Sequence, residues 1–153
     1  MWRARAAGVV SAAVLVSAAN AETVPATGTF PSEITAEDAY TRMVDGAVLI
    51  DVRTPREWSE TGVAQGAWRV ELGDPDFTSK VAAILGSDQS TEVAFICRSG
   101  NRSKTARDRM IAAGYLNATS VAGGTLCPEG WKESGLPIVA IKDPTCERPA
   151  GEC

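Results

Sequence analysis

Short apolar runs alternate with amphipathic stretches along most of this chain. Residues 47–52 and 92–96 are nearly continuous apolar runs, a pattern typical of strands buried on both faces of a parallel sheet. Two further strands are expected over residues 67–72 and near residues 119–122.

Helices are predicted between these strands. The first begins after Thr35, which is placed as N-cap ahead of two acidic residues, and ends near residues 45–46. Thr54 and Glu57 form a capping-box pattern, with Pro55 at the first helical position.

A third helix is expected after residues 74–75, and a fourth from Ser103 to Gly114. Strands that alternate with helices predict an α/β domain, a parallel sheet flanked by helices on both faces.

The N-terminal residues have the composition of a cleavable signal peptide. Arg3 and Arg5 precede an apolar run, and Ala19-Asn20-Ala21 fits cleavage after Ala21. The run is too short to span a bilayer comfortably, so we expect a periplasmic or secreted protein with no membrane attachment after cleavage. An ordinary N-terminal helix is the alternative interpretation.

The rest of the chain divides into three parts. We expect a flexible lead-in over residues 22–32, one compact domain over residues 33–140 and a cysteine-containing tail over residues 141–153. The net charge of -4 argues against a nucleic-acid partner. The sequence sets no oligomeric state.

Export would place four cysteines in an oxidising compartment. If Cys97 works as a thiolate, only Cys127, Cys146 and Cys153 remain, and at most one disulfide forms. A bridge between Cys146 and Cys153 in the tail is the preferred pairing. Cys127 is either a spare or tail-bridged thiol, or a resolving or modulating thiol.

Cys97 is placed where a strand ends and a helix is about to begin. Ligands bind beyond the carboxyl ends of strands in α/β sheets, and unpaired N–H groups at a helix start attract anions. Gly100 supplies the freedom for a tight loop. A simple buried cysteine at a strand end is the alternative. The chain contains no histidine, so loop amides and arginines must favour the thiolate.

These residues resemble the active loop of the rhodanese family, written C-x-x-G-x-R-[ST]. The matching residues are Cys97, Arg98, Ser99, Gly100, Asn101, Arg102 and Ser103. Further landmarks follow in the family's order: Ile50-Asp51-Val52-Arg53, Glu57-Trp58, Gly66-Ala67, Gly114-Tyr115, Val121-Ala122-Gly123-Gly124, Trp131 and Gly135-Leu136-Pro137. The resemblance covers about residues 33–137.

The chain departs from the family pattern at two places. Val63 stands where the family has a histidine, which we expect to alter packing more than chemistry. The segment between Gly124 and Trp131 is longer than usual, contains Cys127 and should lie near the active loop.

The resemblance implies a sulfurtransferase with Cys97 as the catalytic nucleophile. Sulfur would pass from an anionic donor such as thiosulfate, through a persulfide, to a thiophilic acceptor: cyanide in an assay, a thiol or a protein in a cell. It implies that the active-loop residues bind the donor. We expect no cofactor and no metal.

Other roles follow from residue type. Asp51, Arg53 and Glu57 are interpreted as structural support. Arg102 either binds the donor or folds back onto an acid such as Asp51 or Glu57, because buried arginines usually need a carboxylate partner. Three tryptophans either pack in the core or line an apolar mouth: Trp58, Trp68 and Trp131.

Two alternative functions stay open at this point. One is a non-catalytic sulfur carrier that docks a partner oxidoreductase. The other is a Cys-loop phosphatase or arsenate reductase, but those enzymes place five residues between Cys and Arg. Here four residues separate Cys97 from Arg102.

Overall fold

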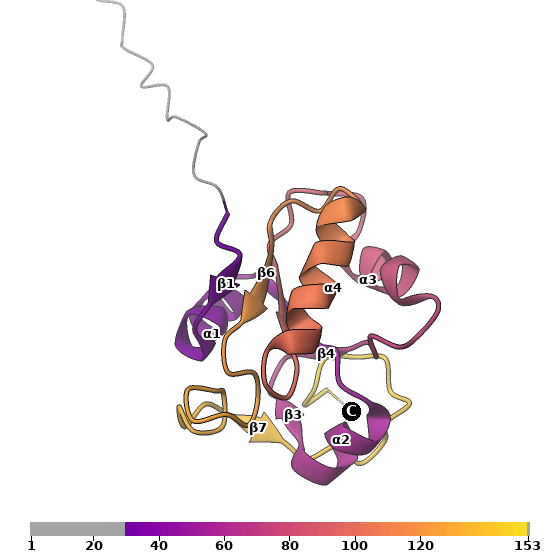
Figure 1. Ribbon diagram of the computed structural model, residues 1–153. Helices are drawn as coiled ribbons and strands as arrows, with labels where there is room; N and C mark the ends of the chain where they lie inside the picture. Colours follow the sequence, from indigo (N-terminus) through magenta and orange to yellow (C-terminus); the bar gives the residue numbers. More distant parts are fainter. Residues whose placement is uncertain (1–29, 153) are drawn as a thin grey trace, which may run out of the picture.

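The computed structural model describes residues 30–152. The predicted signal peptide, residues 22–29 of the predicted lead-in and Cys153 lie outside the described residues. Figure 1 shows the arrangement of the elements, which follow one another in this order. They are β1 (Glu33–Ile34), α1 (Ala36–Val44), β2 (Val48–Asp51), α2 (Pro55–Thr61), β3 (Val63–Ala64), β4 (Trp68–Arg69), α3 (Phe77–Leu85), β5 (Val93–Ile96), α4 (Asn101–Ala112), β6 (Ala118–Val121) and β7 (Ile138–Val139).

The main sheet is parallel and has five strands in the order β1-β6-β5-β2-β4. Its central strands are short and buried. The apolar runs of β2 and β5 predict this, whereas β6 buries the polar Thr119 and Ser120. Neighbouring side chains point to opposite faces: Leu49 belongs to one core cluster and Ile50 to the other. The predicted α/β class is confirmed.

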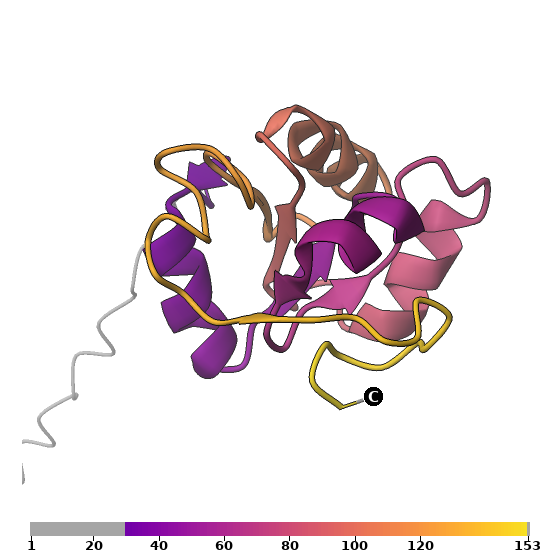
Figure 2. The ribbon, with the colours of Figure 1, turned by 90° about the horizontal axis from the view of Figure 1, so that it is seen from below.

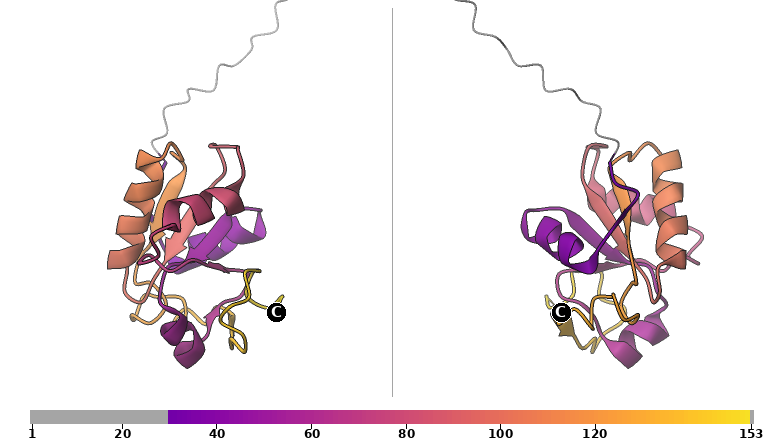
Figure 3. Two further views of the ribbon diagram at one scale, coloured as in Figure 1. Left: turned by 90° about the vertical axis from the view of Figure 1, so that its right-hand side faces the viewer. Right: turned by 60° about the vertical axis from the view of Figure 1, so that its left-hand side comes forward.

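Helices cover both faces of this sheet. Figure 3 shows α1 on one side and α4 on the other. Ala36 and Ala39 of α1 pack in the first cluster, whereas Phe77 of α3 and Met110 of α4 pack in the second. The sheet therefore has two buried faces, and its functional edge lies at the strand ends.

Two helix starts form as their sequences suggest. Thr35 Oγ1 accepts a hydrogen bond from the Asp38 amide at 3.2 Å. Thr54 and Glu57 make both bonds of the capping box at the start of α2. Each cap satisfies backbone donors that the first helical turn leaves without partners.

Three features differ from the sequence-based expectations. β1 was not predicted, and β3 and β7 form a separate antiparallel pair. Strands of two residues leave too little pattern to recognise. α4 begins at Asn101 rather than Ser103, because Gly100 serves as a glycine N-cap without a side-chain bond.

The tail is docked on the domain rather than extended from it. The amide of Ala150 donates to the Ala67 carbonyl at 2.8 Å, and the Gly66 amide donates to the Ala150 carbonyl at 2.8 Å. Figure 2 shows this last segment passing beside α3. Cys146 is disulfide-bonded, but because Cys153 lies outside the described residues, the Cys146–Cys153 pairing stays a prediction.

Candidate active site

Cys97 follows β5 directly and lies at the carboxyl end of the main sheet, four residues before α4 begins. Cys97 is only 1% exposed. The sulfur is therefore buried within the active loop, residues 97–103. A sulfur donor must approach it through that loop.

Two groups contact the sulfur. The Gly100 amide donates to Cys97 Sγ at 3.1 Å, and the thiol faces Ser103 Oγ at 3.7 Å. The Ser103 hydroxyl donates to the Gly100 carbonyl at 2.7 Å. A backbone donor aimed at sulfur, at the start of a twelve-residue helix, stabilises negative charge there.

Gly100 makes this contact possible. Its φ of +105° lies in the left-handed region, which side-chain-bearing residues rarely adopt. The turn it creates reverses the chain after β5 and brings its own amide back onto the sulfur of Cys97.

A second loop, which contains Thr125 and Leu126, holds the backbone of the active loop through hydrogen bonds. The amide and hydroxyl of Thr125 donate to the Cys97 carbonyl at 2.8 and 3.0 Å, and the Leu126 amide donates to the Arg98 carbonyl at 3.1 Å. A side chain at Gly124 would collide with this backbone. The contact of Thr125 with the active loop was not predicted from the sequence. The Gly-Gly pair before Thr125 was the available signal that two backbone segments approach closely here.

Arg102 folds back onto Glu57 rather than reaching over the sulfur. Its guanidinium binds the carboxylate with two bonds of 2.7 Å each. Hydrogen bonding from Arg102, above all, lowers the pKa of Glu57 from 4.5 to about 2. Of the two sequence interpretations for Arg102, the structure therefore supports a brace between α4 and α2.

Asp51 and Arg53 form a separate pair in the interior. Both side chains have no exposed surface, and Arg53 contacts the carboxylate through bonds of 2.6 to 3.0 Å. Arg53 also donates to Thr61 Oγ1 and to the Gly62 carbonyl, at 2.6 and 2.7 Å. This pair ties the end of β2 to the end of α2.

The remaining active-loop side chains face solvent. Arg98, Ser99 and Asn101 are exposed at the mouth of the loop. Arg98 thus carries an exposed positive charge next to Cys97 in the chain, and its backbone carbonyl accepts a hydrogen bond from the Leu126 amide.

The tryptophans and Cys127 occupy different environments. Trp58 and Trp131 are core residues, 4% and 0% exposed, whereas Trp68 is half-buried. Cys127 is a free, half-buried thiol in the loop that clamps the active loop. Val63 is buried and pairs with Val139 of β7.

Within residues 30–152, no group of three or more His, Cys, Asp or Glu side chains is arranged to hold a metal ion. Nor does any helix there have the length and apolar character needed to cross a membrane.

Comparisons with known proteins agree with this geometry. The profile of the rhodanese-like domain family matches residues 35–133. Thiosulfate sulfurtransferase 16 of Arabidopsis thaliana chloroplasts is 32% identical over 119 residues, covering 72% of this chain and 94% of that protein. A sulfurtransferase of Allochromatium vinosum is 32% identical over 71% of this chain and 95% of its own length.

Solved structures give the same result. A rhodanese-related protein from Thermoplasma volcanium superposes with a TM-score of 0.58 and 30% identity, covering 71% of this chain and 98% of that one. A protein from M. tuberculosis superposes with a TM-score of 0.63 and 28% identity, covering 71% and 97%.

Proposed function

This chain belongs to the rhodanese-like family of sulfurtransferases, and from that premise we propose that it transfers sulfane sulfur as a persulfide on Cys97. The observation that carries the proposal is the Gly100 amide, 3.1 Å from Cys97 Sγ at the start of α4. The same donor suits a thiolate before the reaction and a negative persulfide after it.

The chemistry proceeds in two displacements. Thiolate Cys97 attacks the outer sulfur of thiosulfate, the donor's S–S bond breaks, and sulfite leaves with the electron pair. The enzyme then carries Cys–S–S⁻. A nucleophilic acceptor attacks the outer sulfur, takes it away and returns the thiolate, so cyanide becomes thiocyanate.

The site favours a small anionic donor. Cys97 is 1% exposed, so a bulky donor cannot approach the sulfur without moving the loop. Arg98 at the mouth attracts an anion against the overall negative charge of the chain. The burial that restricts access also protects a free thiol in an oxidising compartment.

The position of Arg102 argues against phosphatase or arsenate-reductase activity. A Cys-loop phosphatase needs its loop arginine on the oxyanion, but Arg102 is engaged by both oxygens of Glu57. The four-residue spacing between Cys97 and Arg102 also makes a tighter loop than those enzymes use. Both observations favour sulfur over a tetrahedral oxyanion.

A second candidate is a sulfur carrier without turnover of its own. The low exposure of Cys97 favours it, because a dedicated protein partner could open the loop that a free acceptor cannot. In this version the acceptor is the thiol of a partner oxidoreductase.

We further propose that the protein is exported. The basic residues, apolar run and Ala19-Asn20-Ala21 sequence support cleavage after Ala21 and release into the periplasm or medium. N-terminal sequencing of the mature protein, which should begin at Glu22, tests this.

Intact mass spectrometry tests the central proposal. After incubation with thiosulfate, the wild type and Cys127→Ser should each gain one sulfur atom, and Cys97→Ser should gain none. Equal gain by Cys97→Ser would falsify a Cys97 persulfide. Adding cyanide then distinguishes the two candidates: a turnover enzyme releases thiocyanate repeatedly, whereas a carrier keeps its sulfur.

A further inference from the structure

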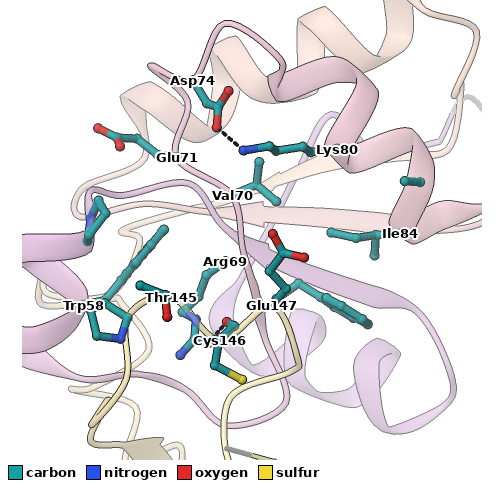
Figure 4. Close-up of a pocket in the computed structure, with 14 residues that line it drawn as sticks. Trp58, Arg69, Val70, Glu71, Asp74, Lys80, Ile84, Thr145, Cys146 and Glu147 are labelled. Atoms are coloured by element: carbon teal, nitrogen blue, oxygen red, sulfur yellow. Dashed lines mark hydrogen bonds and ion pairs between the residues drawn. The ribbon is translucent and has the colours of Figure 1, made fainter.

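The active loop itself contains the groups that can hold a transferred sulfur atom. A cavity of about 560 Å³ beside β4 is lined by α2, β4, α3 and the tail, and no residue of the active loop lines it (Figure 4). Thiosulfate held in that cavity would not meet Cys97. The peptide groups of the active loop must therefore stabilise the sulfur, and their orientation decides how well they do so.

The Cys97–Arg98 peptide group is held by two donors on a single residue of the second loop. The amide and the hydroxyl of Thr125 donate to the Cys97 carbonyl at 2.8 and 3.0 Å. A carbonyl oxygen has two lone pairs, and Thr125 occupies both. Thr125 is 0% exposed, so solvent does not compete for this carbonyl.

These bonds set the direction of the amides that follow. The C=O and N–H bonds of a trans peptide point in opposite directions, and residues 30–152 contain no cis peptide bond. The Arg98 N–H therefore points away from Thr125, and the Ser99 N–H points away from Leu126, which donates to the Arg98 carbonyl. Neither amide donates a hydrogen bond to any group among the described residues. Both are therefore available to an anion.

The second loop is itself firmly held. The Trp131 amide donates to the Gly124 carbonyl at 2.8 Å, and the Lys132 amide donates to the Thr125 carbonyl at 3.1 Å. A Cβ atom at Gly124 would collide with the Cys97 carbonyl, so the two backbones are in close contact. The Thr125 hydroxyl therefore comes from a fixed support, which a positioning group requires.

We infer that Thr125 is a positioning residue for sulfur transfer, an inference that rests on the proposed persulfide on Cys97. The outer sulfur of that persulfide lies one S–S bond, about 2 Å, beyond Cys97 Sγ. It needs donors besides the Gly100 amide, which contacts Sγ. The Thr125 hydroxyl holds the Cys97–Arg98 peptide so that the Arg98 amide supplies one. Thr125 acts through the backbone and not through contact with the sulfur.

Single-turnover loading of sulfur from thiosulfate, followed by intact mass, tests this role. Thr125→Val replaces the hydroxyl by a methyl group. The loading rate at saturating thiosulfate should fall about fivefold, the ratio expected for one net hydrogen bond. The thiosulfate concentration at half-maximal rate should change less than about twofold, because the exposed Arg98 side chain is untouched. Thr125→Ser keeps the hydroxyl and should load at the wild-type rate.

Tyr115→Phe is the matched control for stability. The Tyr115 hydroxyl donates to the Gly86 carbonyl at 3.1 Å, and Tyr115 follows the end of α4 opposite to the active loop. This variant loses one hydroxyl–carbonyl bond, as Thr125→Val does, but should load sulfur at the wild-type rate. A wild-type loading rate in Thr125→Val, or an equal fall in Tyr115→Phe, overturns the positioning role.

Alkylation of Cys97 by iodoacetamide tests Thr125 without sulfur transfer. In a Cys127→Ser background, Thr125→Val should be alkylated more slowly than Thr125→Ser, since misplaced loop amides stabilise less thiolate. If the wild type takes up no sulfur from thiosulfate, the proposed function fails, and equal alkylation rates would then overturn the role of Thr125 as well. If Thr125→Val does not fold, Thr125→Ala, which places no methyl group against the carbonyl, replaces it in both assays.

Discussion

Two arginine–carboxylate pairs adjoin α2 and have opposite settings. Arg53 and Asp51 are completely buried between β2 and α2. Arg102 and Glu57 join the active loop to α2, with side chains 35% and 19% exposed. Both pairs are bidentate, yet one is buried inside the domain and the other borders the active loop.

The difference shows how position sets the consequence of an ion pair. Removing one partner from the interior leaves an uncompensated buried charge, so the buried pair should govern stability. The second pair retains access to water and should contribute less to stability. Its main effect should be on the position of the residues that follow Cys97, because Arg102 belongs to the first turn of α4.

The largest expected effect is on the buried pair. Asp51→Asn keeps the shape of the side chain but leaves the Arg53 charge without its partner. We expect the free energy of unfolding to fall by about 3–5 kcal/mol, measured by urea denaturation. A loss below about 1 kcal/mol would show that the interior tolerates this charge and would remove the contrast between the pairs.

A smaller effect on stability, but a clear one on chemistry, is expected for Glu57→Gln. The variant weakens the hold on Arg102, so the rate of sulfur loading onto Cys97 should fall on the order of tenfold through misplacement of the loop. Glu60→Gln, on the exposed side of the same helix, is the matched control. Unchanged loading in Glu57→Gln would mean that the loop holds its shape without the brace.

The same pair predicts an acid-dependent loss of stability. The pKa of Glu57 is lowered from 4.5 to about 2 in the folded protein, chiefly by hydrogen bonding from Arg102. Its stabilising contribution is therefore complete above pH 4.5 and declines as the pH falls toward about 2. Denaturation curves across this window should show a weaker pH dependence in Glu57→Gln. An identical dependence in both proteins would assign the acid sensitivity to other groups.

The smallest effect is expected at a third pair on the surface. Arg56 and Glu60 are 85% and 53% exposed and are spaced i,i+4 on α2. Arg56→Ala should change the free energy of unfolding by no more than about 0.5 kcal/mol in the same denaturation assay. A larger loss would contradict the expectation that the contribution of an ion pair to stability rises with its burial.

Local patterns predicted the central features of this protein. The apolar runs identified β2 and β5, and caps placed the starts of α1 and α2 within a residue. The position of Cys97 between a strand and a helix was readable because strand end, glycine and helix start are adjacent in the chain. Features formed by residues that are adjacent in the sequence can be predicted without knowing the fold.

Features made by distant segments could not be read in the same way. Thr125 reaches the Cys97 carbonyl across 28 positions, and the docking of Ala150 on Ala67 spans more than 80. The two-residue strands β3 and β7 exist only because their segments meet. Periodicity carries no signal for such pairings.

The sequence by itself determined the α/β class and the family, and it predicts Cys97 as the nucleophile, because alternation, capping and the active-loop pattern are local properties. Only the tertiary structure decided which carboxylate holds which arginine. Asp51 and Glu57 were both candidates for Arg102, and the choice depended on α4 bringing Arg102 beside α2 while Arg53 turned inward to Asp51. Charge type can be read from sequence, but distance and burial set the strength of each pair.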